Sequence, residues 1–250
     1  MLMCEFPASA MHPIELDYSP TFKVISDIDV ATRQRMADLY LANYDGSDTG
    51  RFYRDLATKD EALLVYNNRQ LVGFTTFQSY PRTWKNKPIR VIYSGDTIMH
   101  RKHWGQQALS FAWIKRMGEM KRQFPDQLFY WFLLVKGHRT FRYMPTFGKT
   151  FYPHWSASRV DLKPLADHLA EEKFGKYYNR STGVVEFPTS HGHLKQEIAN
   201  PSTEELTKEA VRYFLDRNPG YKQGHELVCI CEMEEFNMKP LTKRLFRSLD

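Results

Sequence analysis

Hydrophobic and polar residues follow two kinds of spacing along the chain, which together predict a mixture of helices and strands. Apolar side chains recur at helical spacing over 32–44, 50–58, 105–124, 138–146, 165–173 and 203–216. Apolar runs of strand length lie at 21–25, 61–66, 71–78, 89–99, 128–135, 184–187 and 226–232. The uninterrupted run at 128–135 is typical of a strand that is buried on both faces.

The segments between these elements carry turn and breaker signals. Asn67-Asn68-Arg69-Gln70 predicts a hairpin turn, and 81–88 is interpreted as a polar connection. Pro145 is expected to disturb the end of its helix, and 1–18 is expected to be an irregular arm. Without an internal repeat or a linker-like segment, the sequence predicts a single α/β (α+β) domain over 1–250.

Composition excludes several classes of protein. The chain has 250 residues, of which 42% are hydrophobic and 14% aromatic, so disorder is not its main state. The longest apolar run, at 128–135, is too short to span a membrane, which needs about 20 residues. Three cysteines do not form a disulfide framework, and a reducing, cytoplasmic location is therefore expected.

Charge is distributed unevenly along the chain. The segment 79–151 has 14 basic and 3 acidic residues and a net charge of +11, whereas the rest of the chain carries −5. A basic middle segment suits an anionic partner, namely a phosphorylated cofactor, an acidic carrier protein or a nucleic acid.

A strand, a glycine-containing loop and a helix follow one another at 89–124. The first turn of a helix has unpaired backbone N–H groups and a partial positive charge, and Gly105 would let the backbone approach a phosphate closely. The sequence therefore predicts an anion-binding site at this loop.

The order of elements resembles that of the GNAT (N-acetyltransferase-like) acyltransferase superfamily. The family's phosphate loop, Arg/Gln-x-x-Gly-x-Gly/Ala, is matched at the basic first position and the central glycine by Lys102-His103-Trp104-Gly105-Gln106-Gln107, but Gln107 replaces a small residue. In the second signature a strand end is followed by a tyrosine seven residues later. Here these positions are Lys136, which replaces the usual Asn, and Tyr143. The phrase Ser94-Gly95-Asp96-Thr97 resembles a little-described bacterial subgroup.

The resemblance implies a mostly antiparallel central sheet flanked by helices and a bound acyl thioester. It covers 21–155 and the last strand 226–232, and leaves 156–225 as an elaboration of helices and strands that covers the acceptor site. The co-substrate would be acyl-CoA, or acyl-phosphopantetheine on an acidic carrier protein that docks on 79–151, and no metal is needed. The donor contacts it implies are Thr97, Ile98 and Met99 for pantetheine, and Lys102, His103, Trp104, Gly105, Gln106 and Gln107 for pyrophosphate.

The implied reaction is direct attack of an amine on the thioester, which needs a base for the ammonium proton and an acid for the leaving thiolate. Asp96 is the implied base and Tyr143 the implied acid. Lys136 would orient the thioester carbonyl or pair with Asp96. The acceptor would be a small-molecule or peptide amine, and the aromatic residues at 129–155 favour a tunnel for a long acyl chain.

Two other functions stay open from the sequence alone. One is a non-catalytic, GNAT-like binding or regulatory module. The other is a nucleic-acid-binding protein, in which the aromatic residues at 129–132 would stack on bases, although no nucleic-acid motif accompanies them. Cys229 with Cys231, and His191 with His193, offer too few ligands for a zinc site.

Overall fold

The computed structural model describes residues 18–249, and the arm expected over 1–18 lies outside this range except for its last residue. The strands are β1 (Tyr18–Val24), β2 (Tyr44–Asp45), β3 (Glu61–Asn67), β4 (Gln70–Trp84), β5 (Lys87–Met99), β6 (Leu128–Val135), β7 (Tyr178–Asn179), β8 (Val184–Val185), β9 (His193–Leu194) and β10 (Glu226–Glu232). The helices are α1 (Val30–Asn43), α2 (Thr49–Leu56), α3 (Ala108–Gln123), α4 (His138–Phe141), α5 (Tyr143–Phe147), α6 (Lys163–Phe174), α7 (Gln196–Ala199), α8 (Thr203–Leu206), α9 (Glu209–Arg217) and α10 (Pro240–Arg247).

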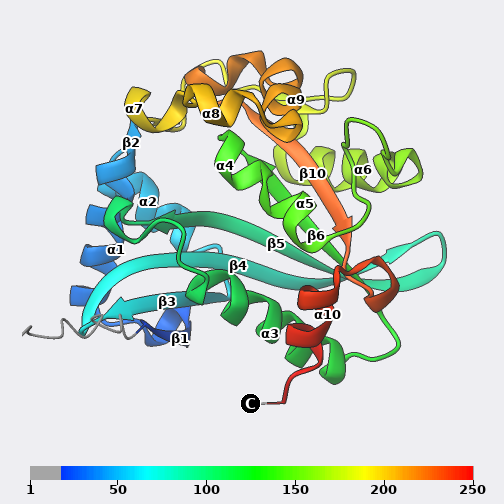
Figure 1. Ribbon diagram of the computed structural model, residues 1–250, viewed down its shortest axis with the longest axis horizontal. Coiled ribbons are helices and arrows are strands. Elements are labelled where there is room, and N and C mark those ends of the chain that lie inside the picture. The colour runs from blue at the N-terminus through cyan, green and yellow to red at the C-terminus, as the bar shows by residue number, and fades with distance from the viewer. Residues whose placement is uncertain (1–17, 250) are drawn as a thin grey trace, which may run out of the picture.

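An eight-stranded sheet with the order β1-β3-β4-β5-β6-β10-β8-β7 forms the centre of the fold. Neighbouring strands in this described sheet are antiparallel except β5 and β6, which pair in parallel from Ile89–Leu128 to Ser94–Leu133. Beyond Ser94 the two strands diverge (Figure 1). The predicted fold class, a mixed and mostly antiparallel sheet flanked by helices, is therefore confirmed.

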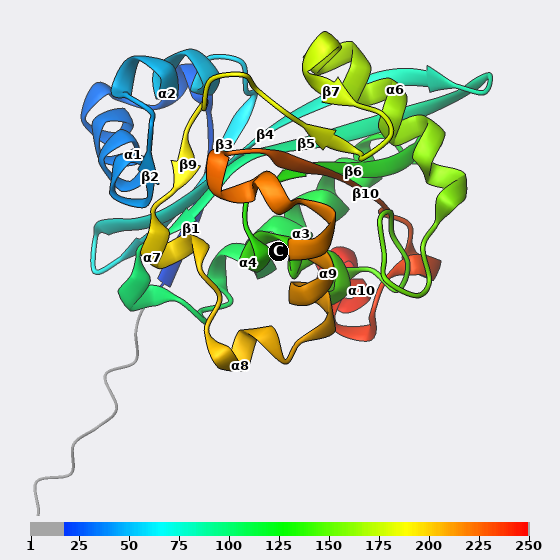
Figure 2. The same ribbon diagram turned by 90° about the horizontal axis from the view of Figure 1, so that it is seen from above.

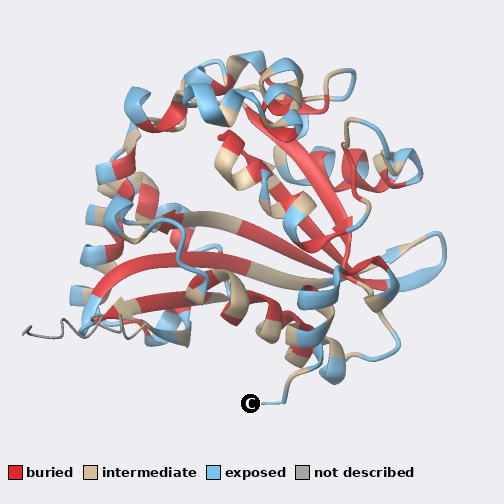
Figure 3. Ribbon diagram, in the orientation of Figure 1, coloured by how far each residue is buried: buried red, intermediate tan, exposed pale blue. Residues whose placement is uncertain are grey.

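Helices cover both faces of this sheet (Figure 2). Side chains of α3, α4, α5, α9 and α10 pack on one face in the largest core cluster, which we call the α3 face. Those of α1 and α2, and separately those of α6, pack on the other face, called the α1 face. Because both faces are covered, the middle strands are buried along most of their length (Figure 3).

A β-bulge in β5 changes which face its side chains occupy. Thr97 is paired with Thr75 and Ser94 with Phe77, so β5 uses three residues where β4 uses two. Side chains alternate between faces along a strand, and one extra residue reverses the alternation. Asp96 therefore lies on the α1 face and Thr97 on the α3 face, each opposite to the face that uninterrupted alternation would give it.

The polar connection expected over 81–88 is wrong. β4 continues to Trp84 and β5 starts at Lys87, and the chain turns at Lys85 and Asn86, whose φ angles are +48° and +61°. Pairing of β4 with β3 ends at Phe77, so Pro81 lies on a free edge where its missing N–H costs no ladder hydrogen bond.

Some helix bounds also differ from the prediction. The helix expected at 105–124 starts only at Ala108, because Gly105 has a φ of +85° that a helix does not contain. The helix expected at 138–146 is divided into α4 and α5, since Pro145 has no N–H to donate to Phe141, four residues earlier. The helix expected at 203–216 is likewise divided, into α8 and α9, and α10 was not predicted.

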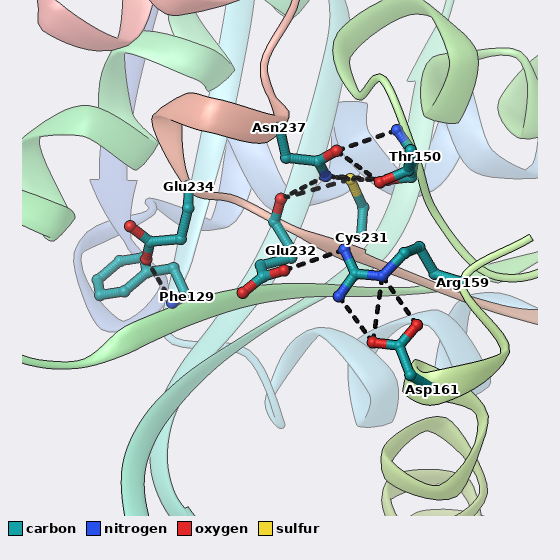
Figure 4. Close-up of polar contacts among 8 residues, drawn as sticks. All are labelled: Phe129, Thr150, Arg159, Asp161, Cys231, Glu232, Glu234 and Asn237. Carbon is teal, nitrogen blue, oxygen red and sulfur yellow. Dashed lines mark hydrogen bonds and ion pairs between the residues drawn. The ribbon is translucent and has the colours of Figure 1, made fainter. Parts of the chain in front are cut away.

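Polar contacts fasten the chain after β10 to the body of the domain (Figure 4). The Asn237 side chain accepts a 2.7 Å hydrogen bond from the Thr150 hydroxyl and donates to the Glu232 carbonyl at 2.9 Å. Arg159 bridges Asp161 and Glu232 at 2.8 and 3.1 Å. These contacts hold the end of β10 and the segment that follows it against the loops at 150 and 159–161.

Candidate active site

Two adjoining pockets occupy the space where β5 and β6 diverge. The larger, of about 460 Å³, lies on the α3 face, and the smaller, of about 220 Å³, lies on the α1 face. They share five lining residues, which are Tyr44, Thr97, Gly137, Thr140 and Leu194. A ligand in one pocket can therefore meet a ligand in the other at the opening between the strands.

The backbone of β5 presents polar groups to this opening. The N–H of His100 donates to the Val72 carbonyl at 2.8 Å, and in an antiparallel pair such bonding residues alternate. Ile98 therefore bonds toward β4, whereas Thr97 and Met99 direct their N–H and C=O groups into the gap. The Trp104 indole N–H donates to the Met99 carbonyl at 2.8 Å, which agrees with this direction.

The loop after β5 leads to the start of α3, as the sequence predicts. His103, Trp104, Gly105 and Gln106 line the larger pocket. Within residues 18–249, the first-turn N–H groups of α3, at 108–110, have no hydrogen-bond partner. A 16-residue helix with three open N–H groups at a cavity is suited to bind an anion.

Lys102 and Gln107, the ends of the predicted phosphate loop, are exposed and do not line the larger pocket. Gln107, which departs from the family pattern, is the residue before α3 and its side chain makes no capping hydrogen bond. Its bulk therefore points away from the space that a ligand in the larger pocket would occupy.

Two arginines flank the indole of Trp104. The guanidinium carbons of Arg101 and Arg139 lie 5.9 and 4.8 Å from its ring centroid. Arg101 pairs with Glu197 at 3.2 Å and Arg139 with Glu205 at 2.9 Å. Trp104, which is 40% exposed, is thereby held across the pocket mouth and closes part of the gap edge of β5.

Asp96 lines the smaller pocket and is half-buried there. In the part of the chain that the structure describes, its carboxylate has no hydrogen bond or ion pair. Burial, together with repulsion from Asp55, raises the pKa of Asp96 to about 6, against attraction by Lys136 and Lys59. A carboxylate with this pKa is ionised at neutral pH and basic enough to accept a proton from an ammonium group.

Lys136 forms its ion pair with Glu226, at 3.2 Å, and not with Asp96 as one of the two predicted roles requires. Burial lowers the pKa of Lys136, but Glu226 and nearby Tyr44 raise it more, so it lies above its ordinary value. The ammonium also lies 5.5 Å from the ring centroid of Tyr44. The side chain is therefore a fixed cation in the wall of the smaller pocket.

Tyr143 lines the larger pocket, on the opposite side of the gap from Asp96. Its ring stacks on Phe147 with centroids 5.9 Å apart, and burial raises its pKa above the usual 10, so the phenol keeps its proton at neutral pH. Beneath it lies a recess of about 10 Å³, whose walls include Thr75, Trp113 and Trp131.

The aromatic residues at 129–155 form core more than cavity. Those that are buried in the core clusters are Phe129, Tyr130, Trp131, Phe132, Phe141, Phe147, Phe151 and Tyr152. The recess next to Tyr143 has room for about one water molecule. These side chains therefore fill the core and do not form the long-chain tunnel that the sequence predicts.

Several polar residues of the smaller pocket were not predicted from the sequence, because no local motif contains them. Tyr44 and Arg51 come from the first helical region, and Glu226 from the start of β10. The elaboration at 156–225 also contributes Phe187 and His191, while β9 pairs with β2 through Leu194 and Tyr44. These residues line one side of the smaller pocket.

Acidic residues from elsewhere in the chain neutralise much of the basic segment 79–151. Ion pairs join Arg82 to Glu172, Arg101 to Glu197, Arg116 to Glu61, Lys121 to Glu234, Lys136 to Glu226 and Arg139 to Glu205. Lys102 and Arg142 stay exposed near the larger pocket, without an ion pair among residues 18–249. Lys85 and Lys87, in the β4–β5 hairpin, are also exposed without an ion pair among the described residues, so open positive charge lies both at this pocket and at that hairpin.

Residues 18–249 contain neither a metal-binding cluster nor a membrane-spanning helix. In that range no group of three or more His, Cys, Asp or Glu side chains is arranged to hold a metal ion. Cys229 and Cys231 are buried in the core instead. None of the described helices is long and apolar enough to cross a membrane.

No family model and no curated protein matches the sequence. The structure is similar to a conserved protein of unknown function from Enterococcus faecalis V583, described as a probable N-acyltransferase, with 14% identity and a TM-score of 0.39 over 53% of this chain and 33% of that one. It is also similar to the GNAT family N-acetyltransferase YhbS from Escherichia coli in complex with CoA, with 13% identity and a TM-score of 0.38 over 59% of this chain and 82% of that one. A third similar structure is Escherichia coli ElaA, with 14% identity and a TM-score of 0.36 over 56% of this chain and 95% of that one. The chain thus spans only about a third of the first of these structures. The likeness is therefore partial.

Proposed function

We propose that the chain is an N-acyltransferase that moves a short acyl group from acyl-CoA to an amine. The observation that carries the proposal is the divergence of β5 and β6 beyond Ser94 and Leu133. It opens one edge of β5 to a cavity that reaches the start of α3 on one face and the unpaired carboxylate of Asp96 on the other.

The larger pocket suits the donor. The amide groups of a pantetheine arm can bond to the free backbone groups of Thr97 and the N–H of Met99, as an added strand would. Its pyrophosphate can accept from the open N–H groups at 108–110, near the charges of Lys102 and Arg142. Trp104 would have to release the Met99 carbonyl for a further bond there.

The smaller pocket suits the acceptor amine. Asp96 takes the proton from the ammonium form, and the neutral nitrogen then attacks the thioester carbon through the shared opening. A carbon–nitrogen bond forms, the carbon–sulfur bond breaks, and the thiolate takes a proton from Tyr143. The nitrogen loses its second proton as it becomes an amide, and this proton restores the Tyr143 phenol, while Asp96 releases the first proton to solvent. Lys136 is too firmly paired with Glu226 to serve as a proton carrier, and in this proposal its charge orients the thioester carbonyl.

The size of the recess beneath Tyr143 favours a short acyl group. Its volume of about 10 Å³, bounded by Trp113 and Trp131, leaves little room beyond the carbonyl. Each additional methylene of a longer chain would displace these buried rings, at a cost typical of overpacking, about 1–3 kcal/mol.

Binding of CoA to the purified protein tests the proposal most directly. We expect native mass spectrometry and calorimetry to show one CoA per chain, and acetyl-CoA to react faster than decanoyl-CoA or palmitoyl-CoA. Lys102→Ala combined with Arg142→Ala should weaken CoA binding at least tenfold at low salt, while Lys23→Ala, at an exposed position on β1, should leave it unchanged.

Failure to bind any CoA thioester would overturn the proposal. Binding only of an acyl carrier protein would support the other predicted donor. Binding of CoA without transfer to any amine would identify a non-catalytic module, and salt-dependent binding of RNA or DNA in place of CoA would indicate a nucleic-acid-binding protein.

A further inference from the structure

The charged side chains around the smaller pocket are mostly paired with one another. Asp55 accepts from Lys59 at 2.7 Å, and Glu226 pairs with Lys136 at 3.2 Å. Lys59 is fully buried and reaches this position because Gly95 has no side chain. A Cβ on Gly95 would lie 2.5 Å from the Lys59 side chain. These two pairs contribute no net charge that a ligand would need to match.

Two charges in the pocket wall are left without a partner, and they have opposite signs. One is the carboxylate of Asp96 on β5, and the other is the guanidinium of Arg51 on α2. Arg51 is half-buried, and its guanidinium makes no hydrogen bond or ion pair within residues 18–249. Its backbone N–H donates to the Asp48 side chain at 2.7 Å, and Phe52 beside it is buried, so the start of α2 is held in place.

We infer that the acceptor is an amine that also carries an acidic group, such as a free amino acid or a small amino-acid derivative. The ammonium group would face Asp96, and the carboxylate or another acid group would bond to Arg51, whose planar guanidinium binds a carboxylate in two parallel hydrogen bonds. This inference rests on the proposed function, because it names the acceptor of that same reaction.

Acceptors of only one sign suit the pocket less well. A polyamine would find an open carboxylate only at Asp96, because Asp55 and Glu226 already pair with lysines. Arg51 would repel its other ammonium groups. A ligand without an amine would leave Asp96 without a partner. If that ligand were also an acid, the carboxylate of Asp96 would repel it. A buried charge that binding leaves unpaired is costly, so the pair Arg51 and Asp96 selects for a ligand with both charges.

The walls between these charges are largely aromatic and the volume is small. Tyr40 stacks on Tyr44 with centroids 4.6 Å apart, and Phe187 stacks on His191 at 3.8 Å. Burial and the nearby charge of Arg51 lower the pKa of His191, so it stays neutral and adds no second cation at neutral pH. A volume of about 220 Å³ is less than half that of the larger pocket, which suits one amino acid with an apolar side chain.

Matched acceptors that differ only in the acid group test this inference. With acetyl-CoA as donor, transfer rates are compared for leucine, leucinamide and isoamylamine, and for phenylalanine, phenylalaninamide and phenethylamine. We expect kcat/KM for at least one of the two acids to exceed that of its amide and its amine at least tenfold. Calorimetric titration of the protein loaded with CoA should show the same order of affinity without any turnover.

Variants of α2 show whether Arg51 causes the preference. Arg51→Gln should raise KM for the preferred acid at least tenfold, change kcat less than threefold and abolish the preference over the amide. Arg51→Lys should restore part of it. Arg54→Gln, one turn along the same helix at an exposed position outside the pocket, should behave as the unchanged chain.

The outcomes separate this inference from the proposed function. Transfer to amides and amines as fast as to acids, or a preference that survives in Arg51→Gln, would overturn the inference and leave the acyltransferase intact. Absence of both CoA binding and transfer would overturn the proposed function. If calorimetry then shows no binding of any acid to the protein alone, the inference is wrong as well.

Discussion

Replacing Asp96 with Asn should make the protein more stable while it removes most of its activity. The carboxylate lies in the smaller pocket without a hydrogen-bonding partner among residues 18–249, near Asp55, Glu226, Lys59 and Lys136. Burial and the repulsion of Asp55 raise its pKa from 3.8 to about 6. An isosteric amide removes the charge and the cost of holding it there.

The sign and size of the effect follow from the two pKa values. Below pH 3.8 the group is protonated in the folded and the unfolded chain, so its charge has no effect on stability. As pH rises, the unfolded chain loses the proton first, which favours unfolding, and above about pH 6 the full cost is present. At about 1.4 kcal/mol for each pH unit, this cost is at most about 3 kcal/mol.

Screening by water in the pocket reduces this value, and we expect Asp96→Asn to stabilise the protein by about 1–2 kcal/mol at pH 8 and not at pH 4. That corresponds to a rise in Tm of about 3–6 °C for a domain of this size. Urea unfolding at both pH values measures the free energy. Asp55→Asn is the contrasting variant, because it leaves the buried Lys59 unpaired and should destabilise the protein at pH 8.

Activity provides a second measurement on the same variant. As general base, Asp96 should give kcat/KM an ascending pH dependence with a midpoint near 6, and its replacement should lower kcat about 10²–10⁴-fold. If Asp96→Asn stabilises the protein relative to the original chain no more at pH 8 than at pH 4, the assignment of an unpaired carboxylate is refuted. Full activity at pH 8 would refute its role as base.

Three further substitutions test the site and the fold. Tyr143→Phe removes the phenolic proton and should lower kcat at least tenfold with KM for acetyl-CoA nearly unchanged, and an unchanged kcat would exclude the tyrosine as the acid. Glu226→Gln leaves the largely enclosed Lys136 without its partner and should destabilise the protein by about 3 kcal/mol in urea unfolding, whereas a neutral effect would mean that the pair is not formed in solution. Gly118→Ala would place a Cβ 1.8 Å from the carbonyl oxygen of Phe246, so α10 must move away from α3. We expect the free energy of unfolding to fall by more than about 2 kcal/mol, and an unchanged Tm would argue against this close contact.

Local periodicity was enough to predict the elements that are regular and strongly apolar. Strands β6 and β10 have the predicted bounds, and β1 and β3 differ by at most three residues at either end. α1 and α2 also lie where helical spacing places them. These elements follow local rules because their own side chains decide which face is buried.

Longer-range packing explains the errors. The sequence pattern assigns Pro81 to a polar connection, because a proline is not expected inside a strand. It is tolerated in β4 because it lies on a free edge, which begins where the pairing of β4 with β3 ends. The charge of the segment 79–151 suggested a docking surface, but its partners, such as Glu172 and Glu234, are distant in sequence. Neither the free edge of β4 nor these ion pairs can be predicted from local sequence patterns.

The sequence by itself predicted the class of fold and the loop before α3, and it offered Asp96, Lys136 and Tyr143 as the candidate reacting groups. Only the tertiary structure decided where those groups lie. The bulge at 94–97 moves Asp96 to the α1 face, because one extra residue reverses the alternation of a strand. Lys136 is paired with Glu226, and Arg51 is brought to the same pocket from α2. Ion pairs and pockets depend on distances between separate elements, which the packing of the sheet and its helices sets.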